Sequence, residues 1–143
     1  MRRGRTDPPA RARGLSLVEV VVLVAVVGIL AAAAWPSHQA QAQRVRRLDA
    51  TAALTGLQQA QEQHRLRHGR YAADLATLGT RATRSAQGLY DLLVQSEGAG
   101  RVTLAARVRA DGAQRDDHEC AEITLVLDEG LADAGPSGRC WNR

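Results

Sequence analysis

The sequence predicts an α+β protein in which one long N-terminal helix packs on a small antiparallel sheet. Three observations lead to this prediction. An apolar segment near the N-terminus continues into a proline-free stretch, residues 37–68, and the C-terminal half alternates between apolar and polar residues in segments that short turns separate. Strands that follow one another through short turns pair antiparallel, and a sheet with one wet face needs a cover such as a helix.

A basic leader precedes the apolar segment. Residues 1–14 contain five arginines against Asp7, so their charge is 5 − 1 = +4, which equals the net charge of the whole chain, 19 − 15 = +4. The remaining chain is therefore neutral, and the high isoelectric point is not the footprint of a nucleic-acid-binding surface. Arginines ahead of an apolar segment predict a cytoplasmic N-terminus, with the rest of the chain in the periplasm.

The apolar segment, residues 15–35, carries one carboxylate. Its 21 residues would span about 31 Å as a helix, enough to cross the hydrocarbon core of a bilayer. An ionised Glu19 inside it would cost roughly 2.5 to 3.5 kcal/mol on insertion scales, so a cationic partner is expected. Cleavage between Gly14 and Leu15 would create that partner, because the new α-ammonium would lie one helical turn from Glu19.

The residues around this carboxylate resemble a known family. The run from Gly14 to Glu19, followed by Ala25, Gly28, Leu30 and Pro36, is similar to the class III signal and N-terminal helix of type IV pilins. The resemblance implies that prepilin peptidase cuts after Gly14 and methylates the new N-terminus at Leu15, and that Glu19 pairs with a neighbouring subunit's N-terminus during docking. At Leu15 the family usually has Phe.

A conventional secretory signal cut near Ala34, or a plain membrane anchor, is the alternative interpretation of the same segment. It would leave a soluble secreted protein or a simple anchored one. Glu19 inside the apolar run, the length of that run, and helical character beyond Pro36 argue against it.

The helix should continue past the apolar segment. Pro36 removes one backbone donor, so it is expected to kink the helix near Ala32, and Gly28 is a second kink position. An apolar stripe is expected to face the sheet, and it consists of Val45, Leu48, Ala52, Leu57 and Ala60. Gly69 should end the helix just after a basic last turn.

The strands follow from period-two patterns. Residues 101–110 and 122–128 alternate cleanly, and Tyr90, Leu92 and Val94 suggest a third strand. Turns are expected at residues 97–100 and 128–130. Residues 71–88 should form a connecting loop with a short helical turn.

The two cysteines, Cys120 and Cys140, are expected to pair, because both lie on the periplasmic side of the predicted topology. Such a bridge would contribute about 3 kcal/mol by the loop-entropy estimate. Two free buried thiols are the alternative. The Cys140-Trp141 ending and the run Gly69-Arg70-Tyr71 resemble PilE-class minor pilins, and the resemblance implies a disulfide-bounded C-terminal region.

Other candidate sites are weak. His64 and His68 lie one helical turn apart, but the arginines between them repel cations, so a solvated helix end is expected instead of a metal site. The acidic residues Asp111, Asp116, Asp117 and Glu119 lack the spacing of a calcium loop and are expected to be solvated. No catalytic arrangement, cofactor motif or metal motif is found in the sequence, and an enzyme is not expected.

The resemblance implies a structural subunit, of the minor class, in a type IV pilus that serves adhesion, twitching motility or DNA uptake. It divides the chain into a cleaved leader (1–14), a transmembrane and assembly helix (15–35), and a periplasmic or extracellular head (36–143). The implied partners are prepilin peptidase, other pilin subunits, the inner-membrane assembly platform and the membrane itself. The chain would begin as an inner-membrane precursor and end in an extracellular filament.

Two alternative functions stay open. A pseudopilin of a type II secretion system would share the N-terminal segment. A DNA-uptake receptor pilin would use arginines on one strand face, namely Arg101, Arg107 and Arg109, to contact phosphates. That face lacks the aromatic residues on which bases stack, which argues against it as a nucleic-acid-binding surface.

Overall fold

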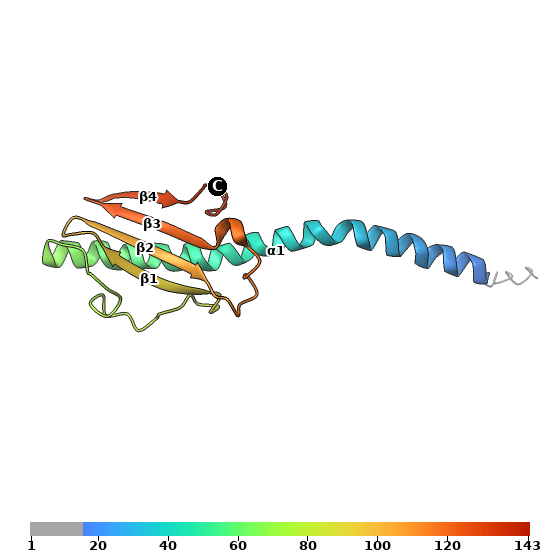
Figure 1. Cartoon of the computed structure of the whole chain (residues 1–143), viewed down its shortest axis with the longest axis horizontal. Coiled ribbons are helices and arrows are strands. Elements are labelled where there is room, and N and C mark those ends of the chain that lie inside the picture. Colours follow the sequence, from blue (N-terminus) through green and yellow to red (C-terminus); the bar gives the residue numbers. More distant parts are fainter. Residues whose placement is uncertain (1–15) are drawn as a thin grey trace, which may run out of the picture. The chain divides into compact units, whose positions relative to one another are not determined.

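The computed structural model describes residues 16–143, apart from the side chains of residues 34–37. One helix is followed by a four-stranded sheet in the order β1-β2-β3-β4 (Figure 1). The chain divides into two compact units, residues 1–38 and residues 39–143, and the helix runs through both. We call residues 39–143 the head.

Helix α1 spans Leu17–His68. Its C-terminal end confirms the prediction, because Gly69 adopts a positive φ of 70° and its N–H donates to the carbonyl of Arg65. The helix is continuous in backbone assignment through Gly28 and Pro36. The kink at these two positions stays a prediction.

The sheet is an antiparallel meander of β1 (Tyr90–Ser96), β2 (Arg101–Val108), β3 (Glu122–Asp128) and β4 (Leu131–Gly135). The first three confirm the predicted strands, although β2 ends two residues earlier than expected. The fourth strand was not predicted. Its sequence, LADAG, is short and weakly apolar, and four of its five residues are small or acidic types that are uncommon in strands.

The core of the head lies between α1 and the inner face of the sheet. Alternate residues of β2 and β3 are buried there, as the period-two pattern predicted. From α1, the buried apolar residues are Ala50, Leu54 and Leu57. The α+β arrangement predicted from the sequence is therefore confirmed.

The predicted helix stripe was wrong at most of its positions. Val45 and Leu48 are each 53% exposed, and only Leu57 of the expected set is buried. The buried face instead contains polar side chains at its two ends, Arg47 and Asp49 at one and Gln61 and His64 at the other. A hydrophobic pattern predicts that such polar residues face the solvent.

The loop after α1 is tied to the helix by two side chains. The Gln61 amide donates to the Ala72 carbonyl at 3.0 Å and accepts from the Ala72 N–H at 2.8 Å. The Tyr71 hydroxyl donates to Glu62 Oε1 at 2.8 Å and accepts from the Gly130 N–H at 3.1 Å. Through Tyr71, the β3–β4 turn is held beside the end of α1.

Candidate functional site

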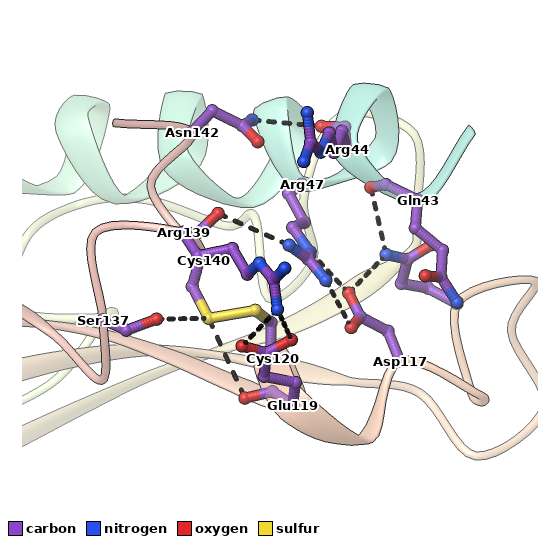
Figure 2. Close-up of polar contacts among 11 residues, drawn as sticks. Gln43, Arg44, Arg47, Asp117, Glu119, Cys120, Ser137, Arg139, Cys140 and Asn142 are labelled. Atoms are coloured by element: carbon purple, nitrogen blue, oxygen red, sulfur yellow. Dashed lines mark hydrogen bonds and ion pairs between the residues drawn. A yellow bond between two sulfur atoms is a disulfide. The ribbon is translucent and has the colours of Figure 1, made fainter. Parts of the chain in front are cut away.

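The polar centre of the head lies where α1 meets the C-terminal region (Figure 2). Cys120 and Cys140 form a disulfide there, with 5.5 Å between their Cα atoms, and both residues are fully buried. The predicted disulfide is confirmed. It joins the short helical turn η1 (His118–Cys120) to the C-terminal tail.

A buried ion pair lies beside the disulfide. The Arg47 guanidinium donates from Nε and Nη2 to the two carboxylate oxygens of Asp117, each at 2.7 Å, and the two residues are 5% and 4% exposed. Arg47 Nη1 also donates to the carbonyl of Arg139. Planar two-point recognition of this kind is a property of arginine that lysine does not share.

Charge and hydrogen bonding keep both members of the pair ionised. Burial alone would raise the pKa of the Asp117 carboxyl, but the hydrogen bond and charge of Arg47 outweigh it, so this pKa lies below its ordinary value. The hydrogen bond to Asp117 likewise raises the pKa of Arg47. Gln114 completes the network, because its amide donates to Asp117 Oδ2 and to the Gln43 carbonyl of α1.

Two further contacts hold the C-terminal tail. Arg139 Nη1 donates to both carboxylate oxygens of Glu119, at 3.1 and 2.9 Å, and the Asn142 amide donates to the Arg44 carbonyl at 3.0 Å (Figure 2). These contacts link α1, the loop after β2 and the C-terminal tail. We call this place the junction, and it is a structural centre of the head.

The predicted solvation of the acidic cluster was wrong for Asp117, which is buried. The other members lie beside arginines: Asp111 pairs with Arg109, Asp116 with Arg115, and Glu119 with Arg139. Among the described residues, no group of three or more potential metal ligands comes together.

The predicted solvated helix end was also wrong at His64, which is only 8% exposed. Its ring lies 4.3 Å, centroid to centroid, from that of His68. Burial lowers the pKa of His64, and the nearby charges of His68, Arg67 and Arg70 lower it further. The end of α1 therefore carries positive charge from Arg67 and Arg70, while the lowered pKa favours the neutral form of His64.

The three arginines considered for DNA contact are matched by carboxylates on the same surface. Arg101 lies 3.2 Å from Glu97 and 3.3 Å from Asp128, and Arg107 lies 2.7 Å from Glu122. Arg109 follows the end of β2 and lies 2.7 Å from Asp111, so the three do not line one strand. The charge that they offer to a phosphate is reduced accordingly.

The residues of the predicted processing site, Gly14 and Leu15, lie outside the described part of the chain. Glu19 lies in the first turn of α1 and is exposed. Around it the large apolar side chains from Leu17 to Leu30 are 44 to 80% exposed. In the described chain no single helix meets the length and hydropathy required of a membrane span, but Leu17–Ala33 and His38–His68 meet them together as a broken pair.

Comparison with known proteins decides the family. The profile of the family described as "Type IV minor pilin ComP, DNA uptake sequence receptor" matches residues 36–124, which is more than half of the chain. The chain belongs to the type IV pilin family. The match covers most of the head, including the strands β1 and β2 and the first three residues of β3.

A curated relative supports the same family. The pilin is 27% identical over 104 residues to the type IV major pilin protein PilE1 of Neisseria gonorrhoeae, and the matched region covers 73% of the pilin and 47% of that protein. The pilin thus matches about half the length of this relative. Together the two comparisons confirm the resemblance inferred from Gly14 to Glu19 and from the C-terminal cysteines.

The buried Arg47–Asp117 pair is the part of the junction that sequence reasoning missed. A signal was present, because Arg47 is spaced three and seven residues from Ala50 and Leu54 on one helix face. An arginine on the core side of a helix needs a buried acid as its partner.

Proposed function

We propose that this type IV pilin is made as an inner-membrane precursor, is cleaved by prepilin peptidase after Gly14, and enters a filament through the N-terminal part of α1. The segments of this proposal are the leader (1–14), the assembly helix (15–35) and the periplasmic or extracellular part (36–143), which contains the head. Its role is structural and not catalytic, and methylation of Leu15 by the same peptidase completes the processing.

The exposed apolar surface of the N-terminal part of α1 carries the proposal. Its valine and leucine side chains contact no other described part of the chain closely enough to be buried. An exposed apolar surface of this extent marks a membrane or protein interface. Lipid would cover it in the precursor, and helices of neighbouring subunits would cover it in the filament.

In this proposal, Glu19 makes the docking of the subunit into the helix bundle specific. Cleavage after Gly14 releases an α-ammonium, and a buried carboxylate is tolerated when such a cation pairs with it. The inner-membrane assembly platform would then act on a subunit whose charges are matched within the helix bundle. The family match favours this pilus role over that of a secretion pseudopilin.

Processing and assembly are tested separately. We expect Gly14→Arg to leave the precursor uncleaved, which the intact mass of the purified protein would show. Glu19→Ala should be processed but recovered in sheared filaments at a reduced level, and Glu19→Gln, which keeps the shape and loses the charge, should behave like Glu19→Ala. Normal incorporation of both Glu19 variants would contradict the charge-pairing role.

DNA reception is a second candidate function, which the description of the matched family favours. Arg67 and Arg70 at the end of α1 form no ion pair within the described residues, unlike Arg107 and Arg109. We infer that phosphate contacts would use the unpaired arginines.

Binding of duplex DNA to the full-length pilin in detergent, measured over a range of salt concentrations, tests this function. The double variant Arg67→Ala plus Arg70→Ala should weaken binding. It should also reduce the slope of the logarithm of the binding constant against the logarithm of the salt concentration by about two. Arg107→Ala plus Arg109→Ala is the matched control, with the same change in charge. A wild-type protein that binds no DNA would exclude the receptor role.

A further inference from the structure

Two exposed patches of the head combine apolar and charged residues. The first, which we call the basic groove, is a hollow on the outer side of α1 that the C-terminal tail borders. Val45 and Leu48 give it apolar surface, and each is 53% exposed. Its cationic residues are Arg44, Arg139 and Arg143.

The second patch, which we call the acidic hairpin, is the β3–β4 turn with the start of β4. Leu131 is 77% exposed there. It lies between Glu129 and Asp133, which are also exposed. β4 is an edge strand of the sheet, so one side of its backbone is free of ladder partners among the described strands.

Apart from Arg139, which pairs with Glu119, the charges of the two patches are unmatched within the described part of the head. Among the described residues, Arg44 and Arg143 form no ion pair, and neither do Glu129 and Asp133. Arg65 approaches the β3–β4 turn, but it is paired with Glu62 at 3.0 Å. The groove therefore offers positive charge beside apolar surface, and the hairpin offers negative charge beside apolar surface.

The two patches lie at opposite ends of the head (Figure 1). Asn142 holds the tail to Arg44, near the start of the head's helix, whereas Tyr71 holds Gly130 beside the helix end. Arg44 and Arg65 are separated by about 30 Å along α1, at 1.5 Å a residue. One copy's groove therefore cannot reach its own hairpin.

We propose that the basic groove of one copy of this pilin binds the acidic hairpin of a second copy. Leu131 would enter the groove beside Val45 and Leu48, while Asp133 and Glu129 would face Arg44 and Arg143. Such a contact is heterologous, and because the two patches lie at opposite ends of the head, it would repeat head to tail in the direction of α1. The inference rests on the proposed assembly into a filament, and it names a contact between heads that is additional to the N-terminal helix.

Cysteine cross-linking in cells tests the contact. Two differently tagged full-length copies are produced together, one with Leu48→Cys and the other with Leu131→Cys, and sheared filaments are oxidised. The native cysteines are engaged in their own disulfide. We expect a covalent dimer carrying both tags. Replacing Leu131→Cys by Ala76→Cys, at another exposed position of the head, should give none.

Charge exchange is the second test. Arg44→Glu and Asp133→Arg should each lower the yield of cross-linked dimer by about two- to fivefold, as expected for an exposed ion pair, and the two changes placed in opposite copies should restore it. Cross-linking of Leu48→Cys to a different pilin, or to nothing while the variant enters filaments normally, would overturn the inference alone. Absence of the wild-type chain from filaments would overturn the proposed function as well.

Discussion

Arg47 and Asp117, 70 residues apart in the sequence, form a two-point ion pair that is almost completely buried beside the disulfide of the head. The pair fixes the loop after β2 against α1, and the Arg47 contact to the Arg139 carbonyl extends this attachment to the C-terminal tail. Substitutions at these residues should therefore change the free energy of unfolding of the head.

Asp117→Ala should destabilise the head by about 3 to 5 kcal/mol, because the Arg47 guanidinium would remain buried without its partner. Urea unfolding of the full-length protein in detergent measures this change. Glu119→Ala is the control, since it breaks an exposed pair with Arg139 and should cost about 1 kcal/mol or less. Equal effects of the two variants would contradict the importance of the buried pair.

The same pair should make stability depend on acid. The pKa of Asp117 is lowered in the folded state from an unfolded value of about 3.9, so its contribution is fully present above that pH and is lost as the pH falls through the folded pKa. We expect the wild-type protein to lose more stability than Asp117→Asn between about pH 5 and pH 2. Parallel pH profiles of the two proteins would rule out this linkage.

Removal of the disulfide should cost about 3 kcal/mol, since Cys120 and Cys140 are separated by 20 residues. Cys120→Ser plus Cys140→Ser should therefore unfold at lower urea concentration than the oxidised wild type. Reductant should shift the wild type toward the variant and leave the variant unchanged. If the fully reduced wild type unfolds at the same urea concentration as the oxidised wild type, the disulfide adds no stability.

The face of α1 that meets the sheet can be tested with two leucines. Leu54→Ala should cost about 2 to 5 kcal/mol, because Leu54 is fully buried in the core. Leu48→Ala should change stability by no more than about 0.5 kcal/mol, because Leu48 is half exposed. Thermal unfolding of the two variants distinguishes them, and a larger loss for Leu48→Ala would reverse the assignment of the helix face.

The strands and the disulfide were predictable because their signals are local or few in number. In residues 122–128, Ile123, Leu125 and Leu127 recur at every second position, and the chain has only two cysteines to pair. β4 was not predictable from its own residues, since its strand conformation depends on pairing with β3. The positive-φ residues Glu129 and Gly130 form the turn between them, and the sequence did indicate that turn.

The prediction of which face of α1 is buried was wrong, and the cause is physical. Apolar spacing alone predicted that Val45 and Leu48 are buried. In the structure, the buried residues are those whose side chains find partners in the tertiary structure. Arg47 is buried because Asp117, far away in sequence, neutralises it, and Gln61 is buried because the backbone of Ala72 satisfies its amide. Pairings between distant residues of this kind have no periodic signature.

The double hydrogen bond between Gln61 and Ala72 also sets where the head can tolerate added sequence. It makes the first residues after the helix part of the rigid framework, so freedom to change length begins only after Ala73. The turn that contains the exposed residues Ala76 and Thr77 lies beyond that anchor and before β1. A short peptide tag for labelling the outer surface of a fibre therefore belongs at that turn, where it would leave both the helix end and the sheet undisturbed.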